Sequence, residues 1–228
     1  MKCIILAGGF ATRLYPITIN QAKALLEYKG KPLISHIVEK VPPGIDILVS
    51  CNRKFEADFR RWQQSLDRPV EIGVEEVWTE EQKKGACGSL EYWVRRQSIT
   101  EDLMVLASDN YFDFDLAGFV AGYDGEHPLV AVYDLGDVSK ATEFGVVSLK
   151  GKRIIRFTEK PARPESSLVA TACYLLPPRV LLLLGDFCAT GKKDNLGGFI
   201  AYLVSRMEVH AYTFSGFWVD IGSADNLA

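Results

Sequence analysis

Short apolar runs alternate with amphipathic segments through the first half of the chain. The run over 3–7 is continuous and stops at Gly8 and Gly9, which is typical of a strand buried on both faces of a parallel sheet. Apolar positions recur at helical spacing after Pro32 and again over 55–66. We therefore predict strands over 3–7, 45–50, 70–74 and 103–107, and helices over 32–41, 55–66 and 88–96. This alternation predicts a sheet that lies between helices.

The second half changes character, because its strand-like runs are joined by loops too short for crossover helices. Gly145 begins one of these runs. The fold class we expect is α/β, a Rossmann-like mixed and mostly parallel sheet between helices, with antiparallel strands added in the second half. No linker or repeat interrupts the chain, so we expect a single domain over 1–228. Strands are expected over 129–135, 145–149, 154–158, 168–176, 209–214 and 217–221, a helix over 194–205, and at most a buried segment at the leucines 181–184.

Composition excludes several classes of protein. The 228 residues carry a formal net charge of −3, with 26 basic and 29 acidic side chains and no basic block, which argues against an obligate nucleic-acid partner. No apolar stretch approaches ~18 residues and no signal peptide is recognisable, so we expect a cytoplasmic chain without a membrane partner. Five scattered cysteines and three isolated histidines favour reduced thiols and no zinc site. These residues are Cys3, Cys51, Cys87, Cys173, Cys188, His36, His127 and His210.

The loop after the first strand carries the clearest chemical signal. Gly8 and Gly9 let backbone N–H groups approach a phosphate, and Arg13 adds a planar donor fork. The dinucleotide fingerprint GxGxxG does not fit, because Phe10 and Arg13 stand where its later glycines belong. A Walker A loop does not fit either, because no Gly-Lys-Ser/Thr closes the segment. Two glycines alone would still be compatible with an ordinary turn.

Further segments, in this order and spacing, decide between these alternatives. They are Ala22-Lys23-Ala24-Leu25-Leu26, Gly30-Lys31-Pro32-Leu33-Ile34, Ser108-Asp109-Asn110, Phe144-Gly145-Val146-Val147, Glu159-Lys160-Pro161 and Trp218-Val219-Asp220-Ile221-Gly222. Together with the glycine loop they resemble the sugar-1-phosphate nucleotidylyltransferase family over nearly the whole chain. Some positions depart from the family's common pattern and bear on substrate identity more than on chemistry. They are Ala11, Ala22, Ser108, Phe144 and Ala172.

The resemblance implies a reaction and a set of roles. A sugar-1-phosphate oxygen attacks the α-phosphorus of a nucleoside triphosphate and pyrophosphate leaves, so the site must gather positive charge around two anions. Leu6, Ala7, Gly8 and Gly9 would then hold the nucleotide and Arg13 the departing pyrophosphate. Lys23 would neutralise charge at the attacked phosphorus. For Lys23 and Lys160 the motif context outweighs the usual fate of lysine as a solvated surface charge.

The remaining roles concern the sugar phosphate, the base and a metal ion. Lys160 would hold the sugar phosphate, whereas Glu159 is either a sugar ligand or a plain carboxylate at the end of a strand. Gly85 and Glu80 would lie beside the base, although Glu80 could instead serve a helix N-terminus. Asp109 and Asp220 would bind Mg²⁺. Asn110, Gly145 and Thr171 complete the sugar-phosphate side that the resemblance implies.

Two classes of function remain open at this point. The favoured one is an enzyme that makes an NDP-sugar, with cytidylyl transfer to a non-sugar phosphate as a variant. The other is a non-catalytic subunit that binds nucleotide or NDP-sugar. Arg13, Lys23, Asp109, Lys160 and Asp220 are all present, which favours the enzyme. We expect no C-terminal β-helix domain and no acetyltransferase activity, and the sequence leaves the oligomeric state open, a homo-oligomer included.

Overall fold

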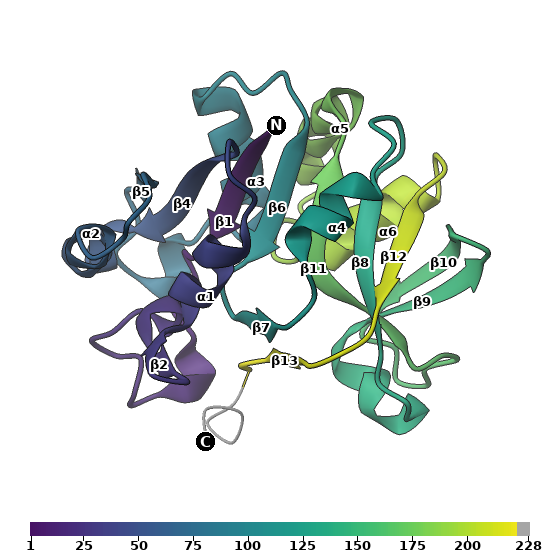
Figure 1. Cartoon of the computed structure of the whole chain (residues 1–228), viewed down its shortest axis with the longest axis horizontal. Helices are drawn as coiled ribbons and strands as arrows, with labels where there is room; N and C mark the ends of the chain where they lie inside the picture. The colour runs from purple at the N-terminus through teal and green to yellow at the C-terminus, as the bar shows by residue number, and fades with distance from the viewer. Residues whose placement is uncertain (223–228) are drawn as a thin grey trace.

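A nine-stranded sheet forms the centre of the computed structural model, which describes residues 1–222 (Figure 1). The strands follow the order β5-β4-β1-β6-β11-β8-β12-β10-β9. The first four are parallel neighbours, as their continuous apolar runs predict. Ile5, for example, pairs with Val49 on one side and Leu106 on the other. Their bounds are β1 (Lys2–Leu6), β4 (Asp46–Asn52), β5 (Glu71–Glu75) and β6 (Leu103–Ala107).

The second half of the chain extends this sheet with strands of both directions. β11 runs antiparallel to both β6 and β8, β12 runs parallel to β8, and β10 runs antiparallel to β12 and β9. Only β10 and β11 therefore oppose the other strands, which confirms the expected mixed, mostly parallel α/β sheet. The bounds are β8 (Leu129–Asp134), β9 (Gly145–Lys150), β10 (Arg153–Glu159), β11 (Leu168–Leu176) and β12 (His210–Phe214).

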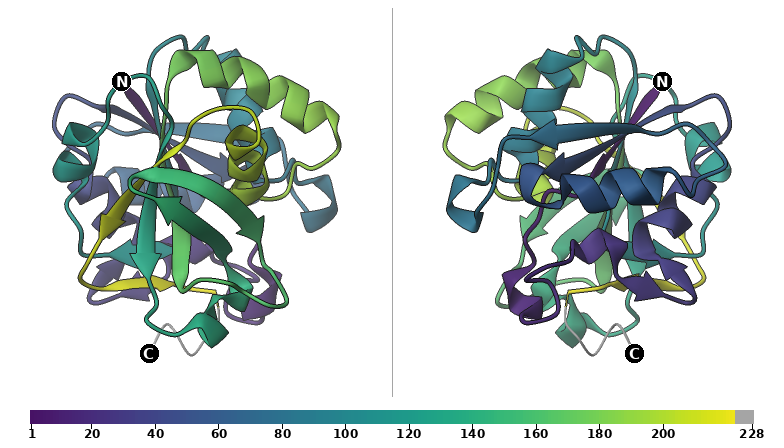
Figure 2. Two further views of the ribbon diagram at one scale, coloured as in Figure 1. Left: turned by 90° about the vertical axis from the view of Figure 1, so that its right-hand side faces the viewer. Right: turned by 90° about the vertical axis from the view of Figure 1, so that its left-hand side faces the viewer.

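Helices cover both faces of the sheet (Figure 2). Successive strand residues point to opposite faces, so Cys3 and Ile5 pack in one core and Ile4 in the other. The first core is closed by α1 (Leu33–Lys40), α2 (Glu56–Gln63) and α4 (Leu116–Ala121). The second is closed by α3 (Ala86–Arg96), α5 (Pro178–Ala189) and α6 (Leu196–Val204).

Helix α5 differs from what the leucine run 181–184 predicts. The run belongs to an amphipathic helix in which Leu181 and Leu184 are buried, whereas Leu182 is 80% exposed. Pro178 occupies the first turn, where its fixed φ and missing N–H cost nothing. The segment is therefore only partly buried.

Short elements complete the chain and bring its last strand toward β6. β13 (Trp218–Asp220) pairs antiparallel with β7 (Asn110–Phe112), which follows β6 directly. β2 (Glu27–Tyr28) pairs with β3 (Lys31–Pro32). The short 3-10 helices are η1 (Thr12–Leu14), η2 (Lys23–Leu25), η3 (Arg53–Phe55), η4 (Glu80–Gln82) and η5 (Val138–Glu143). Within residues 1–222, no helix is both long and apolar enough to cross a bilayer.

All five cysteines are buried and none forms a disulfide. Burial raises the pKa of the Cys51 and Cys87 thiols to about 12. A thiol with so high a pKa carries little thiolate at neutral pH and is a poor nucleophile. The cysteines thus pack as small apolar side chains, as their scattered positions predict.

Candidate functional site

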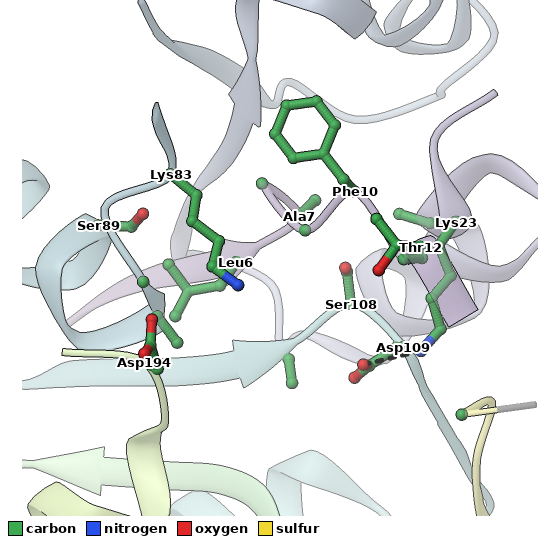
Figure 3. A pocket seen from close by; sticks show the side chains of 18 of the residues that line it. Leu6, Ala7, Phe10, Thr12, Lys23, Lys83, Ser89, Ser108, Asp109 and Asp194 are labelled. Atoms are coloured by element: carbon green, nitrogen blue, oxygen red, sulfur yellow. Dashed lines mark hydrogen bonds and ion pairs between the residues drawn. The ribbon is translucent and has the colours of Figure 1, made fainter. Parts of the chain in front are cut away.

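A cavity of about 740 Å³ opens at the carboxyl ends of β1, β4, β5 and β6 (Figure 3). This is the edge where open α/β sheets place their ligands. The glycine loop after β1 forms part of the wall, and the segment after β13 enters from the far end of the chain. The predicted residues that line this cavity are Leu6, Ala7, Gly8, Gly9, Arg13, Lys23, Glu80, Gly85, Asp109, Lys160 and Asp220.

The glycine loop is fixed by side chains from outside it. Asn52 Nδ2 donates a hydrogen bond to the Gly8 carbonyl oxygen at 2.7 Å, and Thr18 Oγ1 donates to the Ala11 carbonyl oxygen at 2.8 Å. A methyl group placed on Gly9 would meet no protein atom within 4 Å. The protein's own packing therefore does not require glycine at this position. Without a side chain, the backbone at Gly9 can be approached closely by a ligand.

Among residues 1–222, three of the five cationic side chains that line the cavity belong to the predicted site and come from separate elements. Arg13 is exposed on η1, Lys23 is half-buried on η2, and Lys160 follows β10 with a φ of 44°. The Lys160 N–H donates to the Phe144 carbonyl oxygen at 3.0 Å, which holds that left-handed turn. Figure 3 shows Lys23 reaching Asp109, and its Nζ lies 3.0 Å from Asp109 Oδ2. Converging positive charge of this kind suits an anionic ligand.

Two carboxylates meet beside these cations. Asp109 lies just beyond β6, and the Ile221 N–H donates to its carbonyl oxygen at 2.9 Å, so the pairing of β7 with β13 carries Asp220 to the same place. Burial and the charge of Asp109 together raise the pKa of Asp220 to about 7, against the opposing pull of Lys23, Lys160 and Arg13. Two carboxylates that repel each other inside a cavity are the donor set that a divalent cation would stabilise. The residues therefore fit the metal that the resemblance implies.

The opposite wall is formed by η4 and the start of α3. The Glu80 carboxylate forms an ion pair with Lys83 at 2.5 Å, and both side chains line the cavity. Gly85 has a φ of 76°, and a methyl group there would lie 2.4 Å from the Lys193 carbonyl oxygen. Glycine is thus required at 85 by the backbone of the protein itself, before any ligand is considered.

Two of the predicted sugar-side residues are buried behind the cavity wall. Asn110 is 2% exposed, accepts a hydrogen bond from Trp218 Nε1 at 2.7 Å and donates to Asp109 Oδ1 at 2.9 Å. It therefore orients Asp109. Thr171 is 1% exposed and its hydroxyl donates to the Ala131 carbonyl oxygen at 3.2 Å.

Gly145 and Glu159 pack against each other rather than lining the cavity. A methyl group on Gly145 would lie 2.4 Å from the Phe157 ring and 3.1 Å from Glu159 Oε2. One on Gly197 of α6 would lie 2.0 Å from the same oxygen. Burial raises the pKa of Glu159, while the charge of Lys160 lowers it. Small residues on both sides thus make room for this carboxyl group, and contact of these residues with a sugar stays a prediction.

The cavity also contains a buried carboxylate that the sequence reasoning passed over. Glu75 is 2% exposed and accepts hydrogen bonds from Ser50 Oγ at 2.7 Å, Ser89 Oγ at 3.1 Å and Trp93 Nε1 at 3.2 Å. It is the last residue of β5, so its place at the carboxyl edge of the sheet was the available signal. Other lining residues without a prior prediction include Asn52, Ser89, Glu143 and Asp194.

The sequence matches the nucleotidyl transferase family over residues 2–228. The chain belongs to this family. A Sulfolobus acidocaldarius protein assigned as a mannose-1-phosphate guanyltransferase is 27% identical over 225 residues, which are 97% of this chain and 60% of that protein. The Aspergillus fumigatus mannose-1-phosphate guanyltransferase is 28% identical over 236 residues, at 97% and 61% coverage. This chain therefore spans about three fifths of the length of these curated relatives.

The fold of the family is found in solved structures. A Bacillus anthracis protein assigned as a glucose-1-phosphate thymidylyltransferase, crystallised with sucrose, has a TM-score of 0.88 and 26% identity, and the match covers 100% of this chain and 92% of that one. The architecture described above is thus shared along the whole chain. It confirms the nucleotidyl transferase resemblance that the glycine loop and the later motifs indicate.

Proposed function

We propose that this chain, acting as one nucleotidyltransferase domain, transfers a nucleotidyl group from a nucleoside triphosphate to a sugar 1-phosphate. The observation that carries the proposal is the convergence in one cavity of the glycine loop with Arg13, Lys23 and Lys160 and with the carboxylates of Asp109 and Asp220. Relatives assigned as mannose-1-phosphate guanyltransferases and a structural neighbour assigned as a glucose-1-phosphate thymidylyltransferase support a sugar 1-phosphate as the acceptor.

In the proposed step, a phosphate oxygen of the sugar 1-phosphate forms a bond to the α-phosphorus of the triphosphate. The bond from that phosphorus to the oxygen bridging to the β-phosphate breaks, and pyrophosphate leaves with the electron pair. No proton has to move, since the attacking oxygen is already anionic. Catalysis then rests on positioning and on charge.

The cationic side chains divide this work by their positions. Arg13, beside the glycine loop, holds the β- and γ-phosphates and stabilises the charge that develops on pyrophosphate. Lys23 reaches the α-phosphate, next to its partner Asp109. Lys160 comes from the end of β10 and draws the sugar phosphate toward the α-phosphorus, with Glu159 and Gly145 behind it. Each role is assigned from the part of the cavity wall to which the cationic side chain belongs.

Asp109 and Asp220 would hold a divalent metal ion, which the nucleotidyl transferase family generally uses. Mg²⁺ is our choice, because a pair of carboxylates plus phosphate oxygens is the donor set that it prefers. When bound, the ion supplies positive charge at the α-phosphate. Asn110 keeps Asp109 oriented toward this place through its hydrogen bond.

The test is pyrophosphate release with Mg²⁺ and a panel of triphosphates and sugar 1-phosphates, with the products identified by mass spectrometry. We expect an NDP-sugar from at least one pair. Loss of the product in Lys160→Ala, but not in Lys150→Ala on the outer strand β9, would tie it to the cavity. Nucleotide binding without any product would instead indicate a regulatory subunit. CTP consumption only with a non-sugar phosphate would indicate the cytidylyl variant.

A further inference from the structure

Two of the three histidines lie close together at the amino ends of β8 and β12, on the side of the sheet away from the cavity. Asp124 and His127 lie in the loop between α4 and β8, and His210 is the first residue of β12 (Figure 1). β12 pairs in parallel with β8, where His210 aligns with Leu129, and the His210 N–H donates to the Pro128 carbonyl oxygen at 2.8 Å. The sequence treated these histidines as isolated, because only this strand pairing brings them together.

The side chains of this cluster converge on one carboxylate oxygen. Asp124 Oδ2 lies 3.0 Å from His127 Nδ1 and 3.4 Å from His210 Nδ1. The two imidazole rings lie nearly parallel, with centroids 4.5 Å apart. The three candidate donor atoms all lie within 4.8 Å of one another. His210 is 4% exposed, so one donor is buried while His127 and Asp124 are reached from solvent.

Hydrogen bonds from neighbouring residues hold Asp124 and His210 in place. Asp124 Oδ1 accepts the N–H groups of Glu126 at 2.9 Å and His127 at 2.8 Å, which leaves Oδ2 turned toward the imidazoles. On the far side, His210 Nε2 lies 2.8 Å from Glu208 Oε1. A histidine ligand to a metal almost always donates its second N–H to a carboxylate or carbonyl group in this way.

One protonation pattern of His210 leaves a place for a cation between these groups. If the His210 proton sits on Nε2 and is donated to Glu208, Nδ1 presents a lone pair to the Asp124 carboxylate. Two acceptors would face each other at 3.4 Å. A metal ion bound by Asp124 Oδ2 and both Nδ1 atoms removes that conflict. Positive charge already lies near both carboxylates, because Lys152 Nζ is 4.0 Å from Asp124 Oδ2 and an Arg153 nitrogen is 3.9 Å from Glu208 Oε2, so the case for a metal rests on the donor geometry.

We propose that Asp124, His127 and His210 bind one divalent transition-metal ion, with water as the fourth ligand. Two imidazoles and a carboxylate favour Zn²⁺ and its neighbours over Mg²⁺ or Ca²⁺, which prefer oxygen donors. Neighbouring donors on a tetrahedral zinc lie about 3.3 Å apart, close to both Asp–His separations. The ion would clamp the loop before β8 to the start of β12, and it plays no part in nucleotidyl transfer.

The experiment uses Zn²⁺ and the full chain after removal of metals with a chelator, with binding measured by competition against a chromophoric chelator. We expect one Zn²⁺ per chain, and Co²⁺ should give the visible bands of a four-coordinate site. His127→Gln should abolish this site, and Glu208→Gln should weaken it by about 10–100-fold. His127 is half-exposed, so this variant should fold even if His210→Gln does not. Zn²⁺ should raise the thermal midpoint of the parent chain but not that of His127→Gln.

Two further variants separate this site from the cavity. His36→Gln is the matched histidine control, because His36 contacts the Tyr28 carbonyl oxygen instead, and it should bind Zn²⁺ like the parent. Asp109→Asn disables the carboxylate pair of the cavity and should also keep the zinc site. Equal affinity of the parent and His127→Gln would overturn the proposal. So would Zn²⁺ binding that is lost in Asp109→Asn and kept in His127→Gln, since the ion would then belong to the cavity.

Discussion

Replacing Asp220 by asparagine should stabilise the folded chain while removing its activity. The ordinary pKa of 3.8 and the buried value of about 7 differ by about three, and each unit corresponds to ~1.4 kcal/mol. The ionised carboxylate therefore opposes folding by up to about 4 kcal/mol. Because Asp109 supplies part of this effect, we expect a gain of about 2–4 kcal/mol for Asp220→Asn near pH 8 without metal.

The raised pKa of Asp220 fixes how the stability difference between the variant and the parent chain changes with pH. A carboxyl group whose pKa is raised on folding binds its proton more tightly in the folded state than in the unfolded state. Its stabilising effect is complete below about pH 4 and is lost as the pH rises through 7. The difference between Asp220→Asn and the parent chain should thus be near zero at pH 4 and should grow toward pH 8. Mg²⁺ should reduce it, since a bound cation favours the ionised form.

The assay is urea unfolding followed by tryptophan fluorescence at pH 4 to 8 in EDTA, with pyrophosphate release measured in parallel. Asp67→Asn, on an exposed loop, is the matched control and should leave both stability and turnover within error. An Asp220→Asn chain that is less stable than the parent at pH 8 without metal would refute the reasoning. It would mean that the attraction of Lys23, Lys160 and Arg13 outweighs burial and the repulsion by Asp109.

Three further predictions concern the cavity wall. Lys160→Ala should raise KM for the sugar phosphate by about 10–100-fold and KM for the triphosphate much less, and steady-state kinetics giving the reverse order would exclude its assigned side. Arg13→Ala should lower kcat by about 10²–10³-fold with an unchanged melting curve, whereas near-normal kcat would remove its role on pyrophosphate. Gly85→Ala should destabilise the fold by at least ~2 kcal/mol more than Gly44→Ala, because both have positive φ but only 85 meets a backbone atom, at 2.4 Å. Equal losses in urea unfolding would contradict that close approach.

The parallel half of the sheet could be predicted from sequence because burial on both faces leaves a readable apolar run. The predicted strand over 103–107 coincides with β6, and those over 3–7 and 70–74 lie within one residue of β1 and β5. Helix α5 was not predicted, because four consecutive leucines point to all sides of a helix and show no period. Its signal lay in Pro178 and the wider spacing of Val180, Leu184 and Phe187.

Some of the cavity residues could be placed from sequence and others could not, for a similar physical reason. Those on the glycine loop and at the ends of parallel strands could be placed, since one rule fixes the edge at which they emerge. Gly145 and Glu159 could not, because Gly145 packs against a Glu159 carboxyl group that also lies beside Gly197, and this second contact crosses from the sheet to α6. The meeting of His127 and His210 likewise depends on the parallel pairing of β8 with β12, which no local pattern encodes.

The short pairing of β13 with β7 makes the meeting of Asp109 and Asp220 a late and local property of the fold. The pairing joins Trp218, Val219 and Asp220 to their partners, and backbone hydrogen bonds of Phe217 and Ile221 flank it on either side. A few hydrogen bonds and the burial of Trp218 and Ile221 hold this strand in place, whereas the nine-stranded sheet can form without them. The strand can therefore open while the sheet stays folded, so its amides should exchange with solvent faster than those of β1 and β6. Activity would then disappear at denaturant concentrations that leave the nine-stranded sheet intact.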